Sequence, residues 1–156
     1  MKPLVENEDF TKARDYVFTL LKFRNRSEQE IREKLKKKKC AQKTIEKIIQ
    51  YLEDVHFIDD RQFARDWIKA RLTKPFGLRR ISFELSQKGI SKDIIKEELT
   101  AAKGNFPEEE IVVSLTKKIT LKNKGLDKVK LKQKVFGFLS RRGFSLEAIQ
   151  KVVNQI

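Results

Sequence analysis

The chain has 156 residues, and its apolar content of 39% suffices for one ordinary domain or a short array of small repeats with a buried core. Its 36 basic residues exceed its 22 acidic residues by 14 charges, so we expect a polyanionic partner, and nucleic acid is favoured over an anionic membrane. No apolar run approaches the roughly 20 residues of a membrane-spanning helix, and the first ten residues resemble neither a secretory nor a mitochondrial signal, so we expect a cytoplasmic protein without a membrane partner.

The first unit of the chain begins with a predicted helix over about 10–24, where apolar residues recur at steps of three and four. Ser27 and Glu30 form an S-x-x-E capping box that starts a second helix. The lysine run in "EKLKKKKC" (33–40) lies at the C-terminal end of this helix, where cations also complement the helix dipole. Cys40 then stands at the turn into a third helix.

The second unit begins with a predicted helix over about 60–72. Asp59 is placed to cap it, and Ile58 and Phe63 flank the cap as a hydrophobic staple. In the helix pair that follows, Gly89 lies at the junction, where a residue in the left-handed conformation is needed.

The third unit begins with a predicted helix from Pro107 to about Lys122. Three glutamates follow the proline at the positive end of the helix dipole, and the proline itself presets the backbone of a first turn. Gly143 ends the next helix as Gly89 does in the second unit.

The three units repeat one another at offsets of 50 and 54 residues. The aligned apolar positions are Ile31, Ile81 and Val135, then Leu35, Leu85 and Leu139, then Ile45, Ile95 and Ile149. We therefore predict an all-α fold of three tandem three-helix repeats packed into an elongated, curved body, because a helical triplet of about 50 residues is marginal alone. The predicted boundaries are 1–9 for an N-terminal extension and 10–57, 58–104 and 105–156 for the repeats.

Residues with catalytic or metal-binding chemistry are few and isolated. His56 is the only histidine, and we interpret it as an ordinary residue at a helix end. Cys40 is flanked by lysine and is open to a reactive interpretation, but a small apolar residue at an inter-helix turn is preferred. Asp59 and Asp60 are adjacent at a helix start, where side chains diverge, so capping is favoured over a metal site or an acid–base pair. We predict a binding protein with no catalytic residue, metal or cofactor.

Basic residues cluster around equivalent elements of all three units and predict one continuous positive track. For any single residue, a merely solvated helix surface is the alternative. Phe76 and Phe83 are able to stack on single-stranded bases or enter a protein groove, although packing against the neighbouring repeat is preferred. The candidate contact residues are Arg24, Arg26, Arg32, Lys36, Lys39, Arg71, Lys74, Arg79, Arg80, Lys130, Lys132, Lys134, Arg141 and Arg142.

Three segments carry a family resemblance: "FRNRSEQEIREKL" (23–35), "FIDDRQFARDWIKAR" (57–71) and "GLRRISFELSQKGIS" (77–91). They resemble motifs of the RecX regulators of bacterial RecA recombinase, and the resemblance covers essentially the whole chain. The motif residues expected to be structural are Ser27, Leu35, Ile58, Asp59, Asp60, Phe63, Ala64, Leu85 and Gly89. The chain departs from the family where Lys39 and Cys40 replace the usual glycine turn, and its third repeat is degenerate.

The resemblance implies a non-enzymatic regulator that binds RecA filaments on DNA. It would inhibit or modulate ATP hydrolysis, strand exchange and filament growth in recombination, DNA repair and the SOS response. Binding to single- or double-stranded DNA would be weak and sequence-independent, and we expect a monomer.

The alternative is a stand-alone DNA-binding regulator that uses "QKGIS" (87–91) as a helix-turn-helix-like junction. The outward face of the third helices disfavours it, because this face is mixed or acidic: Glu46, Gln50, Glu53, Asp93, Glu97, Glu98 and Glu147.

Overall fold

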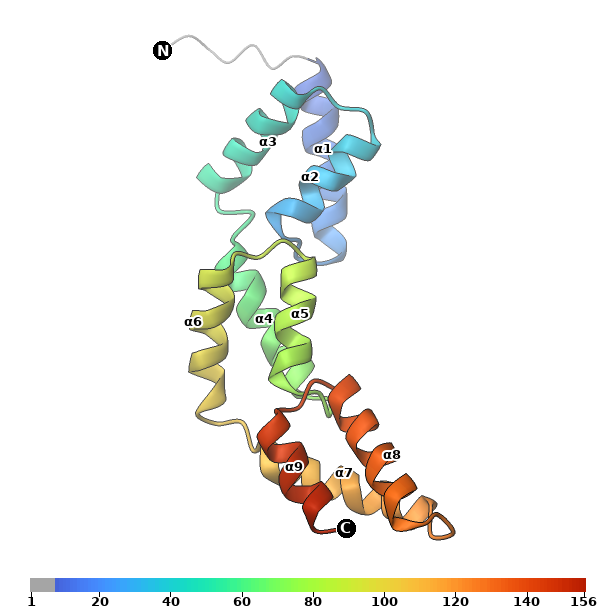
Figure 1. The fold of residues 1–156 in the computed structure, drawn as a ribbon. Coiled ribbons are helices and arrows are strands. Elements are labelled where there is room, and N and C mark those ends of the chain that lie inside the picture. Colours follow the sequence, from blue (N-terminus) through green and yellow to red (C-terminus); the bar gives the residue numbers. More distant parts are fainter. Residues whose placement is uncertain (1–7) are drawn as a thin grey trace.

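The computed structural model describes residues 8–156, which form nine α-helices and no strand (Figure 1). The helices are α1 (Glu8–Phe23), α2 (Glu28–Lys37), α3 (Gln42–Asp54), α4 (Asp60–Leu72), α5 (Leu78–Gln87), α6 (Lys92–Lys103), α7 (Glu108–Lys122), α8 (Lys128–Arg141) and α9 (Leu146–Asn154). They are arranged as three successive triplets along an elongated, curved body, which confirms the predicted fold class. None of these helices is long and apolar enough to cross a bilayer.

Each triplet has a hydrophobic core of its own. The aligned positions from the three repeats are equally inaccessible: Ile31, Ile81, Val135, Leu35, Leu85 and Leu139 are all 0% exposed. The motif residues Ile58, Phe63 and Ala64 are also buried. Because each core is small, the stability of the body depends on the joints between repeats as well as on burial within them.

The helix starts follow the predicted capping chemistry. The Ser27 hydroxyl accepts the Glu30 N–H at 3.2 Å, and the Glu30 carboxylate accepts the Ser27 N–H at 3.1 Å, which completes the capping box. Asp59 caps α4 by accepting the Gln62 N–H at 3.1 Å. Pro107 stands one residue before α7 and contributes no side-chain cap.

The turn between the second and third helix of each repeat has the same backbone geometry. Lys39, Gly89 and Gly143 all have positive φ, at 60°, 75° and 83°. In each case the next residue donates its N–H to the carbonyl five residues earlier, as Cys40 does to Leu35 at 3.1 Å. Lys39 therefore occupies the glycine position of the first repeat.

The joints between repeats are made by helix ends. At the first joint the Ser27 hydroxyl, at the start of α2, donates to the carbonyl of Lys88, at the end of α5, at 2.6 Å. At the second joint the Gly77 N–H, at the start of α5, donates to the carbonyl of Arg142, at the end of α8, at 2.8 Å. The helices α2, α5 and α8 consequently follow one another along the body (Figure 1).

Close approach at these joints explains the glycines. A Cβ atom at Gly143 would clash with the backbone of Arg80, and one at Gly89 would clash with the Gln29 side chain. Within the part of the chain that the structure describes, no other repeat packs against the turn at Lys39, so there is space for a side chain there despite the positive φ.

Candidate functional site

The residues considered for catalysis have structural positions. His56 is exposed and adopts a φ of 58° just after α3. Cys40 is half-buried and packs against the first core. Asp60 accepts the Glu28 N–H at 2.9 Å across the first joint, and burial raises its pKa. Among residues 8–156, no group of three or more metal-binding side chains comes together.

In the first repeat, the predicted arginines are paired within the fold. Arg24 contacts Glu30 at 2.7 Å, and Arg32 contacts Glu28 at 2.8 Å and Glu46 at 2.7 Å. The hydrogen bond that Arg32 donates to Glu46 outweighs the effect of burial and raises the pKa of Arg32 above its ordinary value. Both arginines therefore stabilise the first repeat through ion pairs, and their charges are largely compensated by the paired carboxylates.

The other predicted residues of the first and third repeats differ in their exposure and in their partners. Lys36 and Lys39 project from the end of α2, and the half-buried Arg26 leaves its Nε atom without a hydrogen-bond partner in the described chain. On α8, Lys130 lies 3.8 Å from Asp127, and Lys134 donates to Asn123 at 2.7 Å. Lys132 is half-buried on the same helix. The continuous track expected from the sequence stays a prediction for these residues.

The densest group of predicted residues lies at the second joint, and we call it the arginine junction. Its members are Arg71, Lys74, Arg79 and Arg80 from the second repeat and Arg141 and Arg142 from the third. Phe76 lies at its centre, with the guanidinium carbons of Arg80, Arg142 and Arg71 at 4.0, 5.3 and 5.5 Å from the ring centroid. Cation–π contacts hold these cations together on one ring, in spite of their mutual repulsion.

One carboxylate also stabilises the arginine junction. Glu84 accepts hydrogen bonds from Arg71 at 2.7 Å, from Trp67 at 2.9 Å and from Arg80 at 3.2 Å. Burial would raise the pKa of Glu84, but these three partners lower it overall. Of the six cations, only Arg71 and Arg80 contact this carboxylate, so the surface keeps a strong positive charge.

A shallow groove of about 550 Å³ crosses the arginine junction. Its lining consists of Arg79, Arg80, Ser82, Phe83, Ser86, Ser140, Arg141 and Gly143. In the described chain, Arg79 and Arg141 form no ion pair, so their guanidinium groups face the groove with uncompensated charge. Free guanidinium groups beside hydroxyls are suited to phosphate oxygens.

Phe83 is 64% exposed in this groove, so the expected packing of its ring against the neighbouring repeat is wrong. The joint is formed by helix ends and turns, and it leaves this outward face of α5 uncovered. Phe76 does contact the neighbouring repeat, through Arg142, as expected. An exposed ring beside free arginines is a typical stacking platform for unpaired bases.

The acidic partners of the arginines could not be identified from sequence spacing. Glu98, expected on the outward face of α6, is only 8% exposed and contacts Arg61 and Arg65, each at 2.9 Å. That expectation is wrong because α6 packs against α4 along this side, which brings the carboxylate to the two arginines of α4.

Comparisons with known proteins agree along the whole chain. Sequence models of the first, second and third three-helix domains of RecX match residues 13–52, 59–99 and 107–153. Regulatory protein RecX of Prosthecochloris aestuarii is 32% identical over 97% of this chain and 98% of its own length. Regulatory protein RecX of Clostridium botulinum is 31% identical over 99% of this chain and 73% of its own length. The crystal structure of RecX from Lactobacillus salivarius superposes with a TM-score of 0.82 at 23% identity, over 95% of this chain and 96% of that chain.

Proposed function

The chain belongs to the RecX family of regulatory proteins, and from this we propose that it controls a RecA recombinase by binding the recombinase filament on DNA. It acts without catalysing a reaction of its own, and it lowers or modulates ATP hydrolysis, strand exchange and filament growth during recombination, repair and the SOS response. We place it in the cytoplasm as a monomer.

The arginine junction is the observation that carries this proposal. A filament on DNA presents phosphates and acidic protein side chains together, and a long body with a cationic groove near its middle is suited to both. Arg79 and Arg141 bind phosphate oxygens, and Phe83 stacks on an unpaired base. Such contacts are weak and independent of sequence, because neither reads a base edge.

The functional test is a titration of the protein into a cognate RecA with single-stranded DNA. We expect ATP hydrolysis to fall as the protein approaches the RecA concentration. An unchanged rate over that range, with a folded protein, would refute the proposal.

A matched pair of variants assigns the effect to the arginine junction. The double variant Arg79→Glu/Arg141→Glu should inhibit ATP hydrolysis at least about tenfold less strongly, because two phosphate contacts become repulsive. The control Lys69→Glu/Lys96→Glu has the same change in net charge at exposed positions of the second repeat, and it should inhibit almost as well as the parent chain. If both double variants lost inhibition equally, the effect would come from the overall charge of the protein and not from the arginine junction.

The stand-alone DNA-binding alternative is less well supported. In the second repeat, the proposed helix-turn-helix junction contains Gly89, and this turn is covered by the start of α2 across the first joint. A groove-reading helix pair needs an accessible approach, and here the neighbouring repeat obstructs it.

A further inference from the structure

The turn at the end of α2 has the same backbone conformation as the turns that form the two joints, but among residues 8–156 no repeat packs against it. We call residues Lys37–Ala41 the open turn. The lysines here are exposed, and no hydrogen bond from the described chain reaches the carbonyl oxygens of Lys38 and Lys39. At the equivalent position of the second repeat, the Lys88 carbonyl accepts the Ser27 hydroxyl at 2.6 Å.

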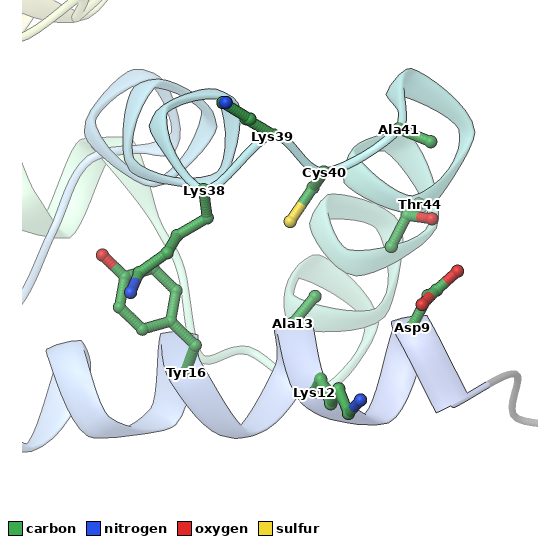
Figure 2. A pocket seen from close by; sticks show the side chains of 9 residues that line it. All are labelled: Asp9, Lys12, Ala13, Tyr16, Lys38, Lys39, Cys40, Ala41 and Thr44. Carbon is green, nitrogen blue, oxygen red and sulfur yellow. The ribbon is translucent and has the colours of Figure 1, made fainter.

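Lys38, within the open turn, lies over an aromatic ring, as its counterpart Lys88 does at the first joint. Lys88 lies over the Trp67 ring at 5.3 Å, and from there its Nζ atom contacts Glu30 of the preceding repeat at 2.7 Å. Lys38 lies over the Tyr16 ring at 4.9 Å, as Figure 2 shows, on the equivalent helix of the first repeat. The ring holds the ammonium group beside the turn, where a carboxylate would reach it.

A cavity of about 480 Å³ separates the open turn from α1. Tyr16, Lys38 and Lys39 line it together with Ala13, Ala41 and Thr44, among others (Figure 2). Its charged lining residues are Lys12, Lys38, Lys39 and Asp9, so lysines outnumber the one carboxylate, and the exposed Lys36 and Lys37 precede the turn. A cation-rich helix C-terminus with free carbonyl groups favours a group that brings both N–H donors and negative charge.

We propose that the open turn docks the N-terminus of an α-helix from a partner protein, one with a carboxylate in its first turn and glycine at its second helical position. The first joint provides the template: the cap hydroxyl of Ser27 meets the turn carbonyl, and the carboxylate at the third helical position, Glu30, meets the lysine. This surface lies in the first repeat, away from the arginine junction, and it is independent of the function proposed above.

The glycine requirement follows from Lys39. At the first joint the side chain of Gln29, at the second helical position of α2, fills the space that a Cβ atom on Gly89 would need. The open turn carries a Cβ atom at this position, so an incoming helix has to leave the space empty.

A second copy of this chain does not meet these requirements. The free helix start at the far end of the body is that of α8, which has Asp127 as its cap and Lys128 and Lys130 in its first turn. Lys130 would take the place of Glu30 and lie beside Lys38. Two ammonium groups in direct contact repel each other.

The test uses the full chain labelled with ¹⁵N and synthetic alanine-based helical peptides of about 20 residues, long enough to be helical in isolation. The first peptide begins acetyl-Ser-Glu-Gly-Glu, the second acetyl-Ser-Glu-Gln-Glu and the third acetyl-Ser-Lys-Gly-Lys. We expect the first to shift the amide resonances of the open turn, the second to bind about tenfold more weakly, and the third to have no effect.

Two variants make the test specific. Lys39→Gly should bind the first two peptides equally well, because the Cβ atom is gone. Lys38→Glu should weaken binding of the first peptide at least about fivefold, whereas Lys47→Glu, an exposed change on α3, should leave it within about twofold.

Several results would overturn the proposal. They are an absence of shifts at millimolar peptide, shifts spread evenly over all exposed lysines, shifts confined to the arginine junction, and a preference for glycine that survives in Lys39→Gly. Binding that appears only after residues 1–7 are deleted would assign the open turn to the chain's own N-terminal segment. Concentration-dependent self-association in sedimentation velocity, lost in Lys38→Glu, would assign it to a second copy. The inhibition of RecA tests the other proposal separately, because none of these measurements contains a recombinase.

Discussion

Replacing Glu30 by glutamine tests how strongly a single carboxylate holds the first joint together. The Glu30 carboxylate accepts hydrogen bonds from Arg24 and Lys88, each at 2.7 Å, and from the Ser27 N–H at 3.1 Å. Burial alone would raise its pKa, but these contacts lower it from 4.5 to about 2. The Glu30→Gln variant keeps the size of the side chain and removes its charge.

The lowered pKa sets the size and the sign of the effect. A fall from 4.5 to about 2 corresponds to at most about 3 kcal/mol of stability at neutral pH. Arg24 is 41% exposed, and solvent screening of its pair with Glu30 reduces the expected loss to about 2 kcal/mol. Because the folded-state pKa is the lower one, this stability is present above pH 4.5 and is lost as the pH falls toward 2.

Urea unfolding followed by circular dichroism measures the difference between the parent chain and Glu30→Gln. We expect the unfolding free energy of Glu30→Gln to be lower by about 2 kcal/mol at pH 7. This difference should decrease by about half between pH 5 and pH 3. The control Glu53→Gln, an exposed change near the end of α3, should alter stability by less than about 0.5 kcal/mol at either pH. A loss in Glu30→Gln that is as large at pH 3 as at pH 7 would refute the electrostatic reasoning.

Three further substitutions test the second joint, the ion pairs of Arg32 and the groove separately. Gly143→Ala should lower the stability by more than about 2 kcal/mol in calorimetry, through its positive φ and a clash with the next repeat, whereas Gly104→Ala, in open space, should not destabilise the chain. Arg32→Gln should cost about 1 kcal/mol in urea unfolding and leave RecA inhibition unchanged; weaker inhibition with unchanged stability would contradict its structural role. Phe83→Ala should weaken single-stranded DNA binding in fluorescence anisotropy by about 1–3 kcal/mol at unchanged stability, and equal affinity would exclude stacking.

The repeat architecture could be predicted from the sequence because burial leaves a periodic trace. Ile31, Ile81 and Val135 are fully buried because each faces an equivalent core, so the alignment of apolar residues gave the register directly. Ser27 could be predicted as a cap for a different reason: a capping box is a local pattern of four residues and can be identified without the fold.

The joints and the charge partners could not be predicted, because they depend on contacts between distant segments. The bond from Ser27 to the Lys88 carbonyl joins residues 61 positions apart, and a backbone acceptor has no sequence signature. Arg32 was expected among the contact residues of the positive track, yet it is paired with Glu46, which lies 14 positions away on the third helix. The exposure of Phe83 could not be predicted, because the sequence does not show which residues of α5 the neighbouring repeat covers.

The two joints have a consequence for the length of the protein. In each joint, the start of the second helix of one repeat meets the turn that ends the second helix of the following repeat. Each repeat also has a core of its own. The architecture is therefore extensible: a further triplet inserted between existing ones would meet the same two surfaces that it presents, and no core would have to be rebuilt.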